Sequence, residues 1–325
     1  MPPEGIHVRL DWMRLVGSDA AFHRVHTILC ETFGQPTSDS IGAKWFRGGI
    51  NWHPGVMLSY GHSSGIVQVD IRGERMTIIG TDSALELMRR IYDLNGFKAT
   101  RLDGAVDFVG QHIELFRNAL HSCKNGELCR LRSFGDKSEY TSSMRPTQIL
   151  LYMGKRDSPV FARIYDKGLE MKLAPIGIWE RLEIEFKEDR ASTLAITLLE
   201  SPDAWPRIVT EVVFGAIDFR VRNGRSELKR RPRAEWWDRI VDGIECRPIP
   251  PMPGVSSFAA WWEWCRTSFG ARFLQVAEIL DRPPATLLPL LLRELTPAET
   301  ESAATVELRA MLAGGRLPSL LDDRR

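Results

Sequence analysis

The stretch RLDGAVDF at residues 101–108 carries the clearest structural signal in the chain, because its polar and apolar residues alternate. Successive side chains of a β-strand point to opposite faces, so Arg101, Asp103 and Asp107 fall on one face. The opposite face is apolar and carries Leu102, Val106 and Phe108. This pattern predicts a strand that buries one face and offers charge on the other.

Two later stretches, 160–167 and 179–187, show the same alternation. Their polar faces carry Phe161, Arg163, Tyr165 and Lys167 in the first stretch, and Arg181, Glu183, Glu185 and Lys187 in the second. If the three strands pair in one sheet, this face gathers acids, bases and one tyrosine. The alternative is an ordinary solvated sheet face with cross-strand salt bridges.

Such a face has the side chains for phosphoryl-transfer chemistry. Carboxylates that lie one or two strands apart can hold a hard divalent cation through oxygen ligands. The cation, together with Arg163 or Lys167, would neutralise phosphoryl oxygens. A tyrosine hydroxyl beside the cation can then act as a nucleophile and form a covalent intermediate.

The rest of the first 245 residues alternates predicted strands and helices. An opening strand over 8–16 precedes a helix that Ser18 caps and that ends at Gly34. Apolar runs at 66–71 and 76–79 predict two strands joined by a hairpin turn at 72–75. Further expected elements are helices over 83–94, about 110–122, 189–200 and 203–216, and a strand near 148–153. The prediction is an α+β fold with a central, mainly antiparallel sheet flanked by helices.

The sequence divides into three segments. Residues 1–245 form the predicted main domain, and the stretch CRPIPPMPG begins a proline-rich linker at 246–255. Beyond it, the TPAE stretch at 296–299 combines a capping box with a proline at the first helical position. Residues 256–325 therefore predict a small all-helical appendage.

Composition excludes a disordered, collagenous or coiled-coil protein. The chain has 325 residues, a formal net charge of +1, 43% hydrophobic residues and 26% charged residues, which is typical of a globular protein. The N-terminus has no signal-peptide pattern, and the most apolar run, at 287–292, is too short to span a membrane. Five scattered cysteines without a zinc-site spacing favour a cytoplasmic protein without membrane partners.

Basic residues gather at 220–239, where two tryptophans, Trp236 and Trp237, lie among them. Cations with interleaved aromatic residues suit phosphate contacts and base stacking. The alternative is a solvated charged loop whose tryptophans pack in the core.

Four motifs resemble those of the trans-type replication initiation factors, the rolling-circle initiators of some plasmids, filamentous phages and conjugative elements. The stretch at 101–108 is similar to the family's R-L-D-x-A-x-D-F motif. Its other motifs resemble YMGKRDS at 152–158, FARIYDKGLE at 161–170 and WERLEIEFK at 179–187. The resemblance covers about residues 5–245, and AIDFR at 216–220 with RAEWW at 233–237 favours the phage branch.

The resemblance implies a site-specific nicking–closing enzyme with a fold related to that of the H-U-H nickases. Such enzymes attack one strand of origin DNA with a tyrosine, which leaves a 5′-phosphotyrosyl enzyme and a free 3′-OH. The chain lacks the His-hydrophobic-His metal motif of those nickases, since His23 and His26 are separated by two residues. Carboxylates would have to replace that motif.

Carried over by motif, Tyr165 is the expected nucleophile, with Tyr152 as its rival. Arg163 and Lys167 are expected to contact the phosphate. The resemblance implies a Mg²⁺ or Mn²⁺ ion held by Asp103, Asp107 and Glu183, with Glu185 less suited. The expected DNA contacts are Arg181, Lys187, Arg222, Arg225, Lys229, Arg230, Arg231 and Arg233.

The implied partners are origin DNA, either supercoiled or locally single-stranded, a host helicase and polymerase, and a second copy of the chain in a homodimer. Two other functions stay open. One is a non-catalytic origin-binding protein or repressor on the same scaffold. The other is a relaxase of a conjugative element, with the same chemistry.

Overall fold

The computed structural model describes residues 2–250, apart from 95, 141, 143–145, 174, 223–226 and 228–229. They belong to one compact unit, Met1–Met252. The expected appendage at 256–325 lies outside the described residues. The described part of the predicted linker, 246–250, forms neither helix nor strand, as its prolines predict. Within the described chain, no helix has the length and apolar character needed to cross a membrane.

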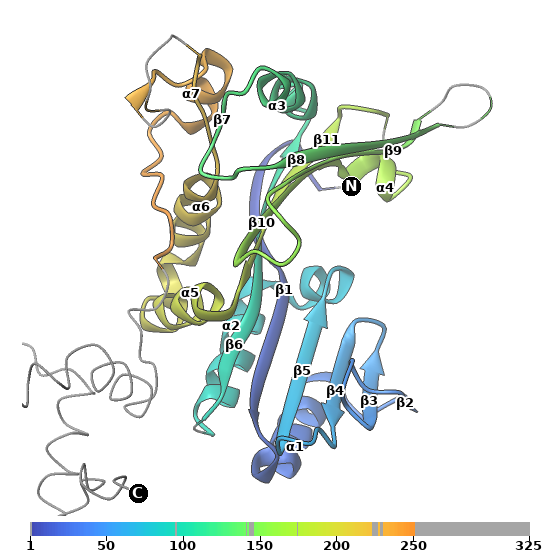
Figure 1. Cartoon of the computed structure of the whole chain (residues 1–325). Helices are drawn as coiled ribbons and strands as arrows, with labels where there is room; N and C mark the ends of the chain where they lie inside the picture. Colours follow the sequence, from blue (N-terminus) through green and yellow to red (C-terminus); the bar gives the residue numbers. More distant parts are fainter. Residues whose placement is uncertain are drawn as a thin grey trace, which may run out of the picture. The chain divides into compact units, whose positions relative to one another are not determined.

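A ten-stranded sheet dominates the described chain, and its neighbouring strands pair antiparallel (Figure 1). From one edge to the other, the strands are β2 (Ser38–Ser40), β3 (Gly48–His53), β4 (Val56–Tyr60), β5 (Ile66–Arg72), β1 (Gly5–Ser18), β6 (Lys98–Val109), β11 (Trp179–Lys187), β10 (Val160–Asp166), β9 (Pro146–Met153) and β8 (Phe134–Tyr140). The α+β fold with a mainly antiparallel sheet, predicted from the alternating stretches, is confirmed.

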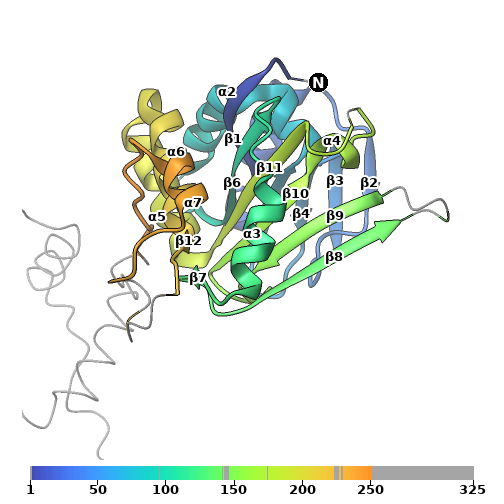
Figure 2. The same ribbon diagram turned by 90° about the horizontal axis from the view of Figure 1, so that it is seen from above.

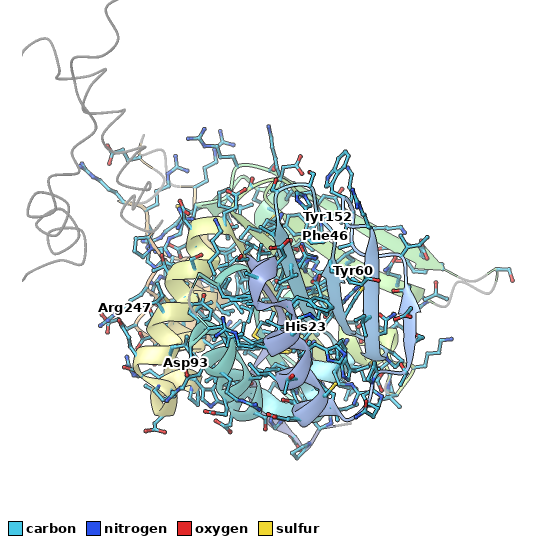
Figure 3. The ribbon with its side chains drawn as sticks, turned by 90° about the horizontal axis from the view of Figure 1, so that it is seen from below. His23, Phe46, Tyr60, Asp93, Tyr152 and Arg247 are labelled. Atoms are coloured by element: carbon cyan, nitrogen blue, oxygen red, sulfur yellow. The ribbon has the colours of Figure 1, made fainter. Side chains whose placement is uncertain are left out.

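The helices of the described chain are α1 (Phe22–Phe33), α2 (Glu74–Tyr92), α3 (Leu115–Lys124), α4 (Lys167–Glu170), α5 (Glu188–Glu200), α6 (Trp205–Ala216) and α7 (Glu235–Val241), with short 3-10 turns η1 (Asp19–Ala21) and η2 (Pro202–Ala204). A small second sheet pairs β7 (Leu128–Cys129) with β12 (Asp218–Phe219). Helices α2, α5 and α6 lie along one side of the central strands (Figure 2). His23 lies exposed on α1, as labelled in Figure 3.

The apolar faces of β6, β10 and β11 form the centre of the core. Leu102, Ile164 and Ile184 are fully buried there, because α5 and α6 pack on β6 and β11 and α3 packs on β10. Gly104 lies under α6, where an added Cβ would come within 2.9 Å of the Val213 side chain. This glycine therefore permits close packing of the helix on the sheet, and its presence between two aspartates has a structural cause.

The N-terminal predictions are confirmed. Strand β1 covers 8–16, the Ser18 side chain accepts a hydrogen bond from the Ala20 amide, and Gly34 follows α1 with a φ of 82°. The hairpin and strand predicted at 72–79 are wrong, because Glu74 begins α2 directly after β5. In that helix Met76 is buried and Ile78 is 60% exposed, so the short apolar run follows the helical period.

Helix α3 begins at Leu115, later than the start near 110 that the sequence predicts. Its N-terminus is anchored by Glu180 of β11, whose two carboxylate oxygens accept hydrogen bonds from the Leu115 and Phe116 amides at 2.8 Å. A carboxylate at this end of a helix satisfies free amides and complements the helix dipole. A residue 65 positions away in the sequence thus fixes where the helix starts.

Candidate active site

Strand register brings the three polar faces together. Across β6, β11 and β10, one row joins Asp107, Arg181 and Tyr165. The next row joins Ala105, Glu183 and Arg163. A third row pairs Asp103 with Glu185. Directly paired residues point to the same side of an antiparallel sheet, so the polar face predicted from the sequence exists as one continuous surface.

A β-bulge in β1 adds a carboxylate that the sequence analysis missed. Leu10 pairs with Gly104 and Trp12 pairs with Asp103, so Asp11 is the extra residue between them. A bulge changes the direction of a side chain within a strand, and here Asp11 reaches Arg181 on the polar face. Two residues, Asp11 and Trp12, separate the apolar Leu10 from the apolar Met13 where strict alternation allows one, which is the signal that could have revealed the bulge.

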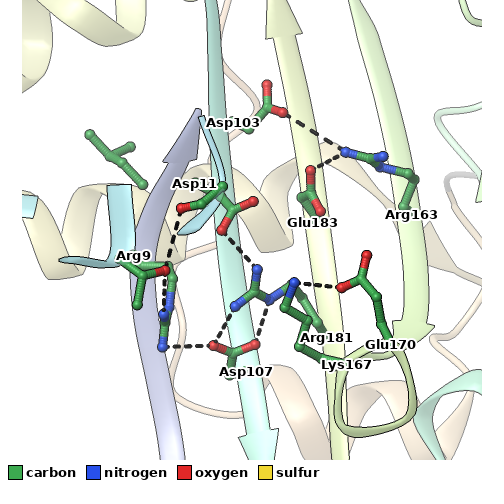
Figure 4. A network of polar contacts seen from close by, with 12 residues as sticks. Arg9, Asp11, Asp103, Asp107, Arg163, Lys167, Glu170, Arg181 and Glu183 are labelled. Atoms are coloured by element: carbon green, nitrogen blue, oxygen red, sulfur yellow. Dashed lines mark hydrogen bonds and ion pairs between the residues drawn. The ribbon is translucent and has the colours of Figure 1, made fainter. Parts of the chain in front are cut away.

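The Tyr165 hydroxyl donates a hydrogen bond to Glu183 Oε2 at 2.8 Å. The other carboxylate oxygen of Glu183 accepts a short hydrogen bond from Arg163, which lies 4.0 Å from Asp103 (Figure 4). Burial and then the charge of Glu183 raise the pKa of Tyr165 well above its ordinary value, more than Arg181 lowers it. The phenol is therefore neutral at physiological pH, and its hydroxyl already contacts the Glu183 carboxylate.

Arg181 is a buried cation beneath Tyr165 and Glu183. It is 1% exposed, donates two hydrogen bonds to Asp107 at 2.6 and 2.9 Å, and donates a third to Asp11 at 2.8 Å (Figure 4). Arg9 also contacts Asp107 at 2.9 Å. Although burial acts to raise it, the contacts with Arg181 hold the pKa of Asp107 below its ordinary value. Arg181 has almost no exposed surface that DNA could contact, so the structure does not support its predicted role as a DNA contact.

Asp103 is fully buried in a second cluster. Arg101 donates hydrogen bonds to both of its oxygens, at 2.9 and 2.5 Å, and also lies 3.2 Å from Glu185. The Arg101 guanidinium stacks 3.7 Å from the centre of the Trp12 ring. Burial raises the pKa of Asp103 to about 8, although Arg101 acts to lower it. The contacts with Arg101 and Arg181 nevertheless match the salt-bridge alternative for Asp103 and Asp107.

A pocket of about 630 Å³ opens above Tyr165. Its lining includes Asp11, Arg163, Tyr165, Lys167 and Glu183. The position of Lys167 is fixed by the first turn of α4. There the preceding residue, Asp166, caps the helix by accepting the Leu169 amide at 2.8 Å and also accepts the Gly177 amide at 2.6 Å. The Lys167 ammonium lies 5.7 Å from the centre of the Tyr165 ring.

The predicted metal set is not assembled as the sequence analysis expected. Asp103 and Asp107 do not line the pocket. Contacts with arginines do not distinguish them, because Asp11 and Glu183 also contact arginines. The described residues contain no group of three or more potential ligands. Asp11 and Glu183 do line the pocket. Burial, and to a lesser extent the charge of Glu183, raises the pKa of Asp11, although Arg181 acts to lower it. Two carboxylates that share a site with a phosphate suit Mg²⁺, which commonly binds one or two carboxylates plus substrate phosphates.

The other predicted DNA contacts differ in their exposure and in their ion-pair partners. Lys187 lies 3.2 Å from Glu185, and Arg222 is exposed. Arg230 pairs with Glu227 at 2.7 Å, Arg233 lies 3.4 Å from Asp218, and the Arg231 carbonyl accepts a hydrogen bond from Arg220. Arg225 and Lys229 lie outside the described residues. The two tryptophans of this segment pack against Phe219, and Trp237 is fully buried, as the core alternative expects.

Comparison with known proteins identifies the class to which this fold and site belong. A sequence model of the replication initiation factors, Rep_trans, matches residues 97–288, more than half of the chain. The chain belongs to the replication initiation factor family. The matched range contains the four motifs that carried the resemblance. No curated protein matches the chain.

Among solved structures, the chain resembles the rolling circle replication initiator protein from Geobacillus stearothermophilus. The TM-score is 0.61 at 22% sequence identity, with 76% of this chain and 99% of that chain covered. At this identity the likeness concerns the fold, which is a large antiparallel sheet flanked by helices. The assignment to the phage branch stays a prediction.

Proposed function

We propose that the chain initiates rolling-circle replication by nicking and rejoining one strand of origin DNA through Tyr165. The observation that supports this most is the hydrogen bond from the Tyr165 hydroxyl to Glu183 inside a pocket that also exposes Arg163 and Lys167. A nucleophile, a base in contact with it and two cations for the phosphate lie within one polar face.

In the proposed reaction, Tyr165 Oη attacks the phosphorus of a phosphodiester while its proton passes to Glu183. The bond from phosphorus to the 3′ oxygen breaks, and that oxygen takes a proton from solvent water to leave as a 3′-OH. Arg163 and Lys167 neutralise the non-bridging oxygens, on which negative charge grows in the transition state. Closing reverses these steps, since a 3′-OH attacks the phosphotyrosine and releases Tyr165.

A divalent cation, Mg²⁺ or Mn²⁺, is part of the proposal, with Asp11 and Glu183 as its protein ligands in place of the set expected from the motifs. When bound, it would supply further positive charge at the phosphate. Asp103 and Asp107 instead hold Arg101 and Arg181 in place. Through them, the strands that carry the pocket residues keep their positions.

The proposed partners follow from the products. A free 3′-OH can prime a host polymerase, and continued synthesis needs a helicase to unwind the duplex ahead of it. Origin DNA that is supercoiled or locally single-stranded would present the strand to the pocket. A homodimer is a further proposal, and so is a cytoplasmic location.

Incubation with supercoiled origin DNA and Mg²⁺ or Mn²⁺ tests the proposal. We expect a nicked circle with protein on its 5′ end, which is lost in Tyr165→Phe and retained in Tyr152→Phe. Chelation with EDTA should stop nicking. Normal nicking by Tyr165→Phe would refute the assignment of the nucleophile. Origin binding without nicking under either metal would favour a non-catalytic origin-binding protein or repressor.

A further inference from the structure

Tyr152 lies beside the proposed active site on β9 and has no part in the chemistry above. It is directly opposite Arg163 of β10 and Gly135 of β8, so the three share the polar face. Tyr165 lies two residues further along β10, and residues in such diagonal positions are about 7–8 Å apart. A group bound over Tyr152 is therefore a near neighbour of a phosphate at Tyr165.

The Tyr152 ring is supported from beneath and from one side. A Cβ built at Gly135 would overlap the ring, so this glycine leaves the space in which the ring lies over β8. The Phe161 ring lies beside it, with ring centres 6.3 Å apart and planes inclined by 24°. Phe161 is 6% exposed, whereas Tyr152 is 38% exposed. The result is an aromatic surface that is fixed from below and open to solvent.

Around this aromatic surface, the cations are partly exposed and the carboxylates that they contact are buried. The Arg156 side chain is 58% exposed, Arg163 28% and Lys187 21%. The carboxylates that they contact, Glu183 and Glu185, are each 3% exposed. A ligand that approaches the face therefore meets the cations first, and the Arg156 guanidinium also lies 5.1 Å from the Phe161 ring centre. This layering gives charge complementarity to a polyanion.

We propose that Tyr152 stacks with a base of single-stranded DNA next to the nicked phosphate, while Arg156, Arg163 and Lys187 contact the adjoining backbone. An aromatic surface for bases inside a basic groove for phosphates is how proteins bind single strands with little sequence preference. The proposal rests on the proposed function, because its ligand is the strand that reaches Tyr165. It gives Tyr152 a positioning role in place of the nucleophile role considered from the sequence.

Fluorescence anisotropy with fluorescein-labelled (dT)20 and the full chain tests this inference. Tyr152→Leu removes the aromatic face but keeps an apolar side chain, and we expect its Kd to rise about 5-fold or more. Tyr152→Phe keeps the ring and should bind within about 2-fold of wild type, since stacking needs only the π-face. Tyr140→Leu is the matched control, because Tyr140 is 53% exposed at the end of β8, and it should leave the Kd unchanged.

Salt dependence separates stacking from charge. Tyr152→Leu should leave the slope of log Kd against log salt unchanged, whereas Arg156→Gln should reduce it, because only the arginine displaces counterions from a phosphate. Circular dichroism spectra that match wild type would show that the variants fold.

Three outcomes would overturn the inference: wild-type affinity in a folded Tyr152→Leu variant, an equal loss in Tyr152→Phe, or loss of nicking in Tyr152→Phe with (dT)20 binding intact. The last would make the Tyr152 hydroxyl part of the chemistry. Failure of the proposed function is distinguishable, because wild type would then not nick origin DNA while the effect of Tyr152→Leu on (dT)20 binding persisted.

Discussion

Arg181→Met should lower the free energy of unfolding more than any substitution at an exposed position of this chain. The guanidinium is 1% exposed and makes three hydrogen bonds to Asp11 and Asp107. Methionine fills a similar volume but leaves two buried carboxylates with Arg9 as the remaining cation beside Asp107. Removal of one partner from a buried ion pair costs about 3–5 kcal/mol, because the charge left behind has lost both its hydration and its counter-charge.

The pH dependence of this loss has a definite sign. In wild type the pKa of Asp107 is held low, so its stabilising contribution is present above its unfolded pKa of about 3.9 and is lost as pH falls further. Without Arg181, burial raises the pKa of the same carboxyl, which then binds a proton in the folded state. The difference between wild type and variant should therefore be largest near pH 8 and become smaller toward pH 5.

Urea denaturation followed by circular dichroism at several pH values measures the effect. Arg117→Met is a matched control, since Arg117 pairs with Glu114 at 3.0 Å with its side chain 78% exposed. An exposed pair of this kind contributes about 0.3–0.5 kcal/mol. A loss below about 1 kcal/mol in Arg181→Met at pH 8, or a loss that grows toward acid pH, would refute the reasoning from burial.

Three further predictions concern neighbouring features. Glu183→Gln should slow nicking by about 100-fold or more, as expected for loss of a general base, while (dT)20 binding stays near wild type; equal nicking would exclude proton transfer to Glu183. Gly104→Ala should lower the free energy of unfolding in urea by about 1–3 kcal/mol, because its Cβ would lie 2.9 Å from Val213; an unchanged midpoint would show that α6 can shift. Burial raises the pKa of Asp103 to about 8 in the folded protein, so the folded state keeps a proton that the unfolded state loses above about pH 4. The free energy of unfolding should therefore fall as pH rises from about 4 to 8. Asp103→Asn should flatten this pH dependence over the upper part of that window. Parallel pH profiles of the two proteins would contradict a raised pKa.

The strands that carry the site were predictable because their signal is local. Alternation within 101–108, 160–167 and 179–187 defines the two faces of β6, β10 and β11, and the structure has these faces. The gathering of Tyr165, Arg163 and Glu183 follows once those strands are neighbours. Their pairing order was assumed from the shared pattern, and the register that unites them became known only from the structure.

The errors arose where local pattern competes with long-range contacts. The stretch at 76–79, with three apolar residues and one threonine, is too short to distinguish a strand from a helix, and burial of Met76 in the core favours the helix. Which carboxylates meet arginines and which line the pocket depends on contacts such as that between Asp11 and Arg181, which are 170 residues apart. No spacing rule along the chain contains that information.

The bulge in β1 makes the length of this strand as important as its composition. Deletion of one residue between Leu10 and Met13 would produce a more regular strand, with the same apolar residues in the core. The shorter strand would have room for only one side chain on the polar face of the sheet where Asp11 and Trp12 now follow one another. Either Arg181 would lose its second carboxylate or Arg101 would lose the ring on which it stacks. Relatives with a one-residue gap at this point should therefore differ in the wall of the pocket while keeping the same fold.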